Sequence, residues 1–303
     1  MNTSVCRSGV ISETSVGKTS TRLRAKPPHA FKTDFSYSLR GAGGPAILTT
    51  TATYRDPPCQ IELSKLVQTG GTAKTTTTAA LGVLLSRAGI HVHMVDMDPQ
   101  SSLTQAFGQR DREDRLYNAL TSRAQLPIDE LSSTLTLSPS SVELGRAETE
   151  LMTEPGREYY LRTCLQNTDL PDDAIVLLDC PPSLGLLSVN CMAAAGGMIA
   201  PVQPGGFELH ALAHLHLTME TIRERLQPNL CMLGAVIANA HLRRAITDQV
   251  RDEVDRLHPV LGVVRTDARM LYASSAGDML RLSRSRALDD YAAVAGQLEC
   301  MIQ

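Results

Sequence analysis

A glycine-rich segment, residues 70–76, stands directly before a stretch that favours helix, and its residue types suit the binding of phosphate. Gly70 and Gly71 carry no Cβ, so their backbone amides can approach phosphate oxygens closely. Lys74 supplies a cation for the terminal phosphates, and Thr75 supplies a hydroxyl that can reach Mg²⁺. The amides and dipole of a helix N-terminus also favour an anion. The segment therefore predicts a polyphosphate-binding loop made of Gly70, Gly71, Thr72, Ala73, Lys74, Thr75 and Thr76.

Two acidic residues follow apolar runs further along the chain. Asp98 comes after the run 92–95, and Asp179 ends the run 174–178. Ligands of open parallel sheets gather at the carboxyl ends of the strands, so we expect both carboxylates to point toward the phosphate loop. One can position an attacking water, and the other can hold the shell of Mg²⁺. Asp96 shares a face with Asp98 if the strand continues; a direct role and a structural role on nearby loop amides are equally open for it.

These motifs carry a family resemblance. The segment 67–77 resembles the deviant Walker A motif of the ParA family, the ParA/MinD-type P-loop ATPases that include Soj-like partitioning proteins. The segment 95–100 is similar to the second motif of that family, 178–185 to its Walker B motif, and 199–204 to the strand and loop that follow. The order and spacing also match, and the resemblance covers residues 65–300.

The resemblance implies ATP and Mg²⁺ as ligands, with phosphate bound at residues 70–76 and the metal held at Thr75 and Asp179. It implies that Asp98 positions the hydrolytic water and that Lys74 is the second catalytic residue. Family members form ATP-dependent homodimers, bind DNA non-specifically and are stimulated by a ParB-type DNA-binding partner. The implied function is an ATP-hydrolysing switch for plasmid or chromosome segregation, acting in the cytoplasm at the nucleoid.

Two residues depart from the family pattern. Thr69 occupies the place of the family's signature lysine, which reaches the phosphates of the facing subunit. A threonine cannot supply that charge, so we expect ATP to bind but to be hydrolysed slowly. Ala73 replaces the glycine before Lys74. Alanine costs about 1 kcal/mol if that position requires a positive φ, and nothing if the position is helical.

Other members of the wider superfamily offer alternative functions. A MinD-like positioning ATPase needs a basic amphipathic helix at the C-terminus, whereas residues 287–303 contain acidic residues and neither Lys nor Arg. An iron–sulfur reductase needs cluster-binding cysteines, but only Cys164 lies between Gln100 and Asp179. A nucleotide-binding protein with weak hydrolysis stays open because of Thr69.

Composition limits the partners and the compartment. The 303 residues are 43% hydrophobic with a formal net charge of -3, so any contact with nucleic acid depends on a local patch. The seven cysteines are odd in number and form no CxxC pair, which indicates a reducing cytoplasm. No apolar run is long enough to cross a membrane, and we expect no membrane partner.

The chain divides at about residue 58. Before position 41, seven basic residues stand against two acidic ones in a Ser/Thr-rich background. This composition predicts a disordered extension over residues 1–58, with a DNA-binding arm or an organellar transit peptide as alternatives. Residues 59–303 are expected to form the ParA-like domain.

Apolar runs alternate with amphipathic segments in that domain. The alternation predicts an α/β fold, a doubly wound and mostly parallel sheet with helices on both faces. Strands are expected at 61–67, 91–95, 135–137, 174–179, 197–202 and 231–238. Helices are expected at 74–88, 145–165 with a break near Pro155 and Gly156, 209–226, 247–257 and 286–302.

Basic and imidazole side chains form further candidates. Two arginine clusters, Arg243 with Arg244 and Arg281 with Arg284 and Arg286, match the region of ParA-like proteins that contacts DNA. Surface charge is an equally good interpretation, because residues 231–303 contain nine Arg and nine Asp or Glu. His210 and His214 have the i, i+4 spacing of a metal clasp, but an exposed helix face is the preferred interpretation.

Overall fold

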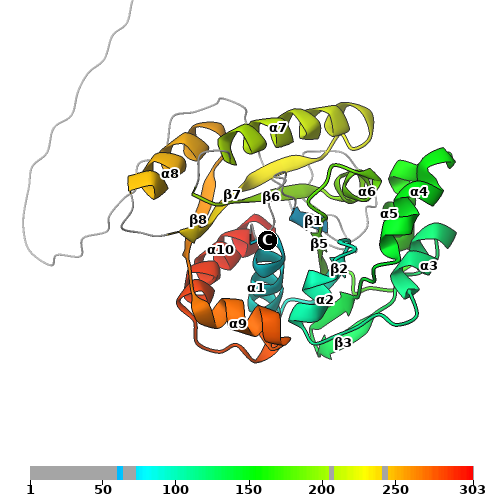
Figure 1. Ribbon diagram of the computed structural model, residues 1–303, viewed down its shortest axis with the longest axis horizontal. Helices are drawn as coiled ribbons and strands as arrows, with labels where there is room; N and C mark the ends of the chain where they lie inside the picture. Colours follow the sequence, from blue (N-terminus) through cyan, green and yellow to red (C-terminus); the bar gives the residue numbers. More distant parts are fainter. Residues whose placement is uncertain (1–59, 64–72, 205–207, 241–244, 303) are drawn as a thin grey trace, which may run out of the picture. The chain divides into compact units, whose positions relative to one another are not determined.

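The computed structural model describes residues 60–63, 73–204, 208–240 and 245–302 (Figure 1). The expected extension over residues 1–58, the loop residues Thr69, Gly70, Gly71 and Thr72, and Arg243 with Arg244 lie outside this part of the chain. None of the helices described is long and apolar enough to cross a membrane.

A sheet of eight strands forms the centre of the described residues, in the order β3-β4-β2-β5-β1-β6-β7-β8. Every neighbouring pair is parallel except β3 and β4, which run antiparallel at one edge. The strands are β1 (Gln60–Leu63), β2 (Val92–Asp96), β3 (Asp129–Ser132), β4 (Leu135–Ser138), β5 (Ile175–Asp179), β6 (Gly197–Val202), β7 (Cys231–Ala240) and β8 (Val260–Arg265).

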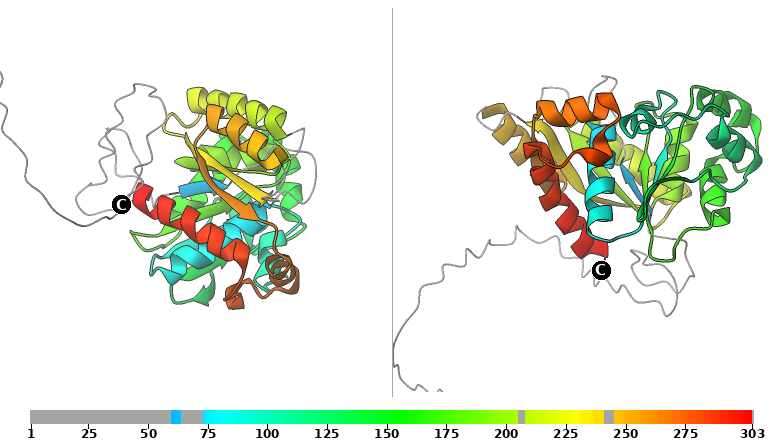
Figure 2. Two further views of the ribbon diagram at one scale, coloured as in Figure 1. Left: turned by 90° about the vertical axis from the view of Figure 1, so that its left-hand side faces the viewer. Right: turned by 90° about the horizontal axis from the view of Figure 1, so that it is seen from below.

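Helices cover both faces of this sheet (Figures 1 and 2). One face carries α1 (Lys74–Arg87), α2 (Ser102–Ala106), α9 (Ala268–Ala276) and α10 (Arg286–Ile302). The other carries α3 (Arg115–Ser122), α4 (Leu144–Glu150), α5 (Tyr160–Asn167), α6 (Leu186–Ala194), α7 (Glu208–Arg225) and α8 (Ala245–Leu257). Short 3₁₀ turns lie at η1 (Leu151–Thr153), η2 (Arg157–Tyr159) and η3 (Met279–Arg281).

The central strand β5 shows why both faces need helices. Successive side chains of a strand point to opposite faces, and every residue of β5 is buried. Val176 and Leu178 belong to the core under α3 to α8. Ile175 and Leu177 belong to the core under α1, α2, α9 and α10. The continuous apolar run is thus a strand buried on both faces, and the predicted doubly wound α/β fold is confirmed.

The predicted bounds hold best where the pattern is long and apolar. Strand β6 and helix α10 have the predicted limits, and α1 ends one residue early, at Arg87. The predicted helix over 145–165 is interrupted as expected, but the structure resolves it into α4, two 3₁₀ turns and α5. The first strand was predicted over 61–67; it occupies Gln60–Leu63, and 64–67 lie outside the described residues. Six short helices and strands were not predicted from the sequence, namely α2, α3, β3, α6, β8 and α9.

Three adjacent strands end at the same level of the sheet. Asp96 at the end of β2 is in register with Asp179 at the end of β5, which is in register with Leu63 at the end of β1. Helix α1 follows β1 in the chain and packs against β1, β2 and β5. The fold therefore brings the start of α1, Asp96 and Asp179 to one edge, and the predicted Asp98 follows two residues after the end of β2.

Candidate functional site

Helix α1 begins with a left-handed residue. Ala73 has φ 63° and ψ 12°, and its carbonyl accepts the first helical hydrogen bond, from Thr77 N at 2.8 Å. The left-handed conformation costs an L-residue about 1–2 kcal/mol, which glycine avoids. Of the two cases considered for Ala73, the structure therefore shows the costly one.

The first turn of α1 directs polar groups at the end of β5. The Lys74 ammonium, only 8% exposed, donates to Cys180 O at 2.6 Å. The Thr75 hydroxyl donates to Asp179 Oδ2 at 2.8 Å. Thr78, one helical turn later, donates to Asp179 Oδ1 at 3.3 Å. Thr78 was not predicted, although its i+3 spacing from Thr75 places it on the same helix face.

Asp179 is a fully buried carboxyl group whose ionisation is opposed by its surroundings. Burial raises its pKa to about 6, and the nearby Asp98 adds to the rise. The Lys74 charge and the hydroxyls of Thr75 and Thr78 lower the pKa and offset part of this effect. The balance leaves an excess of buried negative charge, which suits a bound cation.

Asp96 is also fully buried, next to Asp179 on the adjacent strand. Burial, together with the charge of Asp179, raises its pKa to about 8. Its oxygens accept hydrogen bonds from Asp98 N at 3.2 Å, Thr104 N at 2.8 Å and Thr104 Oγ1 at 2.7 Å, which oppose the rise. These contacts favour the structural interpretation of Asp96, because its partners are loop and helix groups.

Asp98 follows β2 and is 8% exposed. Its Oδ1 accepts a hydrogen bond from Gln100 N at 2.9 Å, and its charge contributes to the raised pKa of Asp179. The carboxylate thus lies near the predicted metal-binding acid and keeps some contact with solvent. Such a group can hold a water molecule next to a bound phosphate.

The donor set fits a magnesium-bound polyphosphate. Mg²⁺ prefers oxygen ligands and is usually held by one or two carboxylates together with substrate phosphates. The structure places Thr75 Oγ1 and Asp179 side by side, with the Lys74 cation at the same edge. No cluster of three or more His, Cys, Asp or Glu suited to a metal occurs among the described residues, so phosphate oxygens would have to complete the shell.

The remaining candidates are placed as follows. Thr76 is half-buried in the first turn of α1, whereas Gly70, Gly71 and Thr72 lie outside the described residues. His214 is exposed on α7, in keeping with a solvent-facing helix surface. The side chain of His210 lies outside the described part, so its pairing with His214 stays untested.

Known proteins resemble this chain in sequence. Residues 63–232 match the AAA domain family. The chain is 32% identical over 244 residues to the sporulation initiation inhibitor protein Soj of Bacillus subtilis, covering 76% of this chain and 95% of Soj. It is 36% identical over 194 residues to the chromosome partitioning protein ParA of Myxococcus xanthus, covering 62% of this chain and 68% of ParA.

A solved structure gives the same result at the level of the fold. The cobyrinic acid a,c-diamide synthase of Mycobacterium smegmatis, with bound ADP and magnesium, superposes with a TM-score of 0.67 at 26% identity. The match covers 80% of this chain and 94% of the synthase. The sequence motifs, the doubly wound sheet and these matches lead to one conclusion: the chain belongs to the ParA/Soj family of P-loop ATPases.

Proposed function

We propose that this protein is an ATP-driven switch for DNA partition that binds ATP and Mg²⁺ at the amino-terminal end of α1. The observation that carries the proposal is the meeting of Lys74, Thr75 and Asp179, with Asp98 beside them. The nucleotide and magnesium in the related synthase structure support the choice of ligands. The name of the Myxococcus relative supports the choice of process.

Each residue has a distinct role in this proposal. Lys74 holds the terminal phosphates together with the loop residues 70–73, and Thr75 and Asp179 hold the metal shell. When bound, Mg²⁺ neutralises charge on the phosphate oxygens. Asp98 orients the water that attacks the terminal phosphate. When phosphate binds, Lys74 either breaks its hydrogen bond to Cys180 O or keeps it, because its ammonium group has three N–H donors.

Thr69 makes this switch slow in our proposal. The family's signature lysine acts on the nucleotide of the facing subunit, so its replacement affects the ATP-dependent homodimer more than ATP binding by one subunit. We expect Thr69→Lys to raise the steady-state ATPase rate while the Kd for ATP stays within twofold. Equal rates for the wild type and Thr69→Lys would contradict this role.

An arginine-rich surface near η3 is the proposed contact with non-specific DNA. Residues 265–286 include five arginines and two aspartates. Arg281, Arg284 and Arg286 are exposed, and Arg281 forms an ion pair with Asp278 at 3.3 Å. Exposed arginines can bind phosphates by releasing counterions from DNA.

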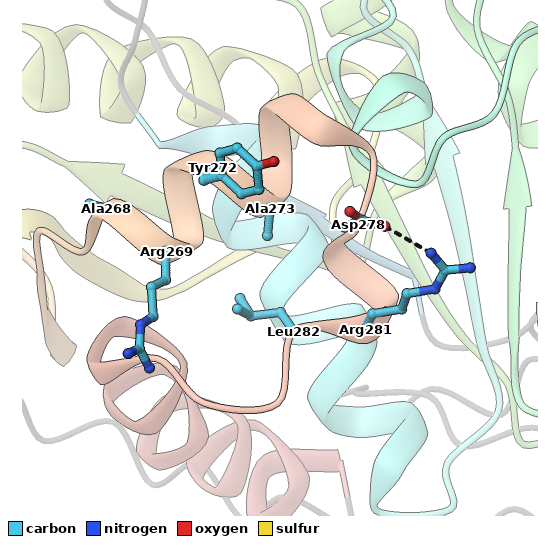
Figure 3. A pocket seen from close by; sticks show the side chains of 7 residues that line it. All are labelled: Ala268, Arg269, Tyr272, Ala273, Asp278, Arg281 and Leu282. Atoms are coloured by element: carbon cyan, nitrogen blue, oxygen red, sulfur yellow. Dashed lines mark hydrogen bonds and ion pairs between the residues drawn. The ribbon is translucent and has the colours of Figure 1, made fainter.

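This surface is hollowed rather than flat. A hollow of ≈ 430 Å³ is lined by residues that include Arg269, Tyr272, Arg281 and Leu282. In Figure 3, Leu282 lies between the side chains of Arg269 and Arg281. Tyr272 is 71% exposed, which leaves an aromatic face free to contact a sugar or base. The combination of cations and an exposed ring favours nucleic acid over a purely apolar ligand.

The membrane-positioning alternative receives less support from the same region. In α10 the sole basic residue is Arg286, at its first position, and Asp289 and Asp290 follow three and four residues later. A helix of this composition does not complement an anionic membrane. A ParB-type partner remains part of the proposal through family membership alone.

Retention on DNA tests the proposal. We expect the wild type to be retained with ATP and Mg²⁺ and released without them, and Lys74→Ala to be released in both conditions. The double variant Arg281→Gln with Arg284→Gln should bind ATP normally but lose retention on DNA. The slope of the DNA-binding constant against salt concentration, both on logarithmic scales, should decrease by about two, one for each lost phosphate contact. Arg112→Gln, an exposed arginine before α3, is the matched control. Equal retention on DNA with and without ATP would contradict an ATP-dependent switch.

A further inference from the structure

Asp98 is held at its main chain by a closed ring of buried hydrogen bonds. On one side, its amide donates to Asp96 Oδ1 at 3.2 Å. On the other side, its carbonyl accepts from Ser140 Oγ at 2.9 Å. Ser140 N donates to Thr104 Oγ1 at 2.8 Å, and Thr104 Oγ1 donates to Asp96 Oδ2 at 2.7 Å, which closes the ring.

The ring members come from separate parts of the fold. Asp96 ends β2, Thr104 lies in α2, and Ser140 lies in the loop after β4. Asp96, Thr104 and Ser140 are 0%, 1% and 2% exposed, so water does not compete for these bonds. Thr104 is the centre of the ring, because its single hydroxyl donates to Asp96 and accepts from Ser140.

We propose that Asp96, Thr104 and Ser140 form an Asp98 clamp, a set of positioning residues that fixes the main chain of Asp98 and thereby aims its carboxylate at the hydrolytic water. The clamp rests on the proposed role of Asp98 in hydrolysis. None of the three side chains contacts nucleotide in this proposal; they act through Asp98. The clamp gives Asp96 a specific task at the site, beyond its place next to Asp179.

The geometry predicts an effect on turnover rather than on binding. A misplacement of about 1 Å can reduce catalysis by about 10²-fold. Thr104→Val keeps the shape of the side chain but removes both bonds of its hydroxyl. We expect kcat for ATP hydrolysis to fall by about tenfold or more, while the Kd for ATP stays within twofold. Thr104→Ser retains the hydroxyl and should restore most of the rate.

Ser141 provides the matched control for the clamp. It follows Ser140, and its Oγ is buried without a hydrogen-bond partner among the described residues. Ser141→Ala should therefore leave kcat unchanged, whereas Ser140→Ala, which removes the bond to Asp98 O, should lower it. If Thr104→Val does not fold, as judged by its thermal melt, the comparison of Ser140→Ala with Ser141→Ala decides the question.

A double-variant experiment separates the clamp from the proposed function. In the Asp98→Asn background, Thr104→Val should cause no further loss of kcat, because residues that act as one unit are not additive. A further loss there, or a normal kcat in Thr104→Val alone, overturns the clamp. A normal kcat in Asp98→Asn overturns the proposed role of Asp98 itself.

Discussion

His93 lies in the middle of β2, fully buried between two hydroxyl groups. Ser138 Oγ donates its only hydrogen to Pro127 O at 2.6 Å, so it must accept from His93 Nε2, 2.9 Å away. His93 Nδ1 then accepts from the Thr136 hydroxyl at 2.8 Å. The network assigns the neutral tautomer with its proton on Nε2. A second proton on this ring has no solvent and no carboxylate among these partners to stabilise it.

The cost of protonating His93 appears as a loss of stability in acid. Burial lowers its pKa from 6.5 to about 4. Below pH 6.5, His93 binds a proton in the unfolded chain, whereas in the folded chain it stays neutral down to about pH 4. The stability contribution is therefore complete above pH 6.5 and disappears as the pH falls toward 4. At 1.36 kcal/mol per pKa unit, the free energy of unfolding loses about 3 kcal/mol between pH 7 and pH 4.

Urea unfolding of the wild type and His93→Gln at both pH values measures this contribution. The difference in unfolding free energy between the two proteins should shrink by about 3 kcal/mol from pH 7 to pH 4. The buried carboxyls Asp96 and Asp179 titrate in both proteins, so their contributions cancel. His214→Gln, at an exposed position on α7, is the matched substitution for comparison. A difference for His93→Gln that is constant with pH would refute the reasoning.

Three further substitutions test single contacts, each by thermal or urea unfolding. Ala73→Gly relieves the strain of the positive φ, but glycine also loses more backbone entropy on folding. The net effect should be a stabilisation of up to about 1 kcal/mol. A lower melting temperature would contradict the assigned conformation. Tyr291→Phe removes the buried bond to Thr77 Oγ1 at 2.7 Å and should cost about 1 kcal/mol; no loss would mean that the hydroxyl is not bonded. Asp290→Asn weakens the bidentate contact with Arg265, at 2.8 and 2.7 Å, and should lower the melting temperature slightly, less so in high salt because the pair is partly exposed; a melting temperature equal to that of the wild type at low salt would contradict a stabilising role of the pair.

The parts of the fold that the sequence predicts are those with a strong apolar signal. Strand β5 has an uninterrupted apolar run, a pattern that is typical of a strand buried on both faces. The antiparallel edge strand β3 has the sequence Asp-Glu-Leu-Ser, half exposed, and its pairing depends on β4 rather than on its own composition. Helix α2 has five residues and depends on its packing against α1 and α9. Local propensity cannot predict such elements, because tertiary contacts stabilise them.

The candidate site divides in the same way. Lys74, Thr75, Asp98 and Asp179 are predictable because glycine-rich spacing and acidic strand ends are local features. The Asp98 clamp is not, because Ser140 reaches Asp98 across 42 residues of sequence with no periodic pattern. Thr78 falls between these cases, since helical spacing from Thr75 points to it only after α1 is known to face Asp179.

Two unfavourable features of this chain lie at the proposed nucleotide site. Ala73 adopts a left-handed conformation directly before α1, and Asp179 is buried with its pKa raised. Backbone strain and a buried acidic group at the same edge of a sheet indicate a functional site. Such costs persist in a protein where function requires them. A bound polyphosphate with Mg²⁺ would offset both costs, since the amides at the start of α1 gain an anion and the carboxylate gains a cation.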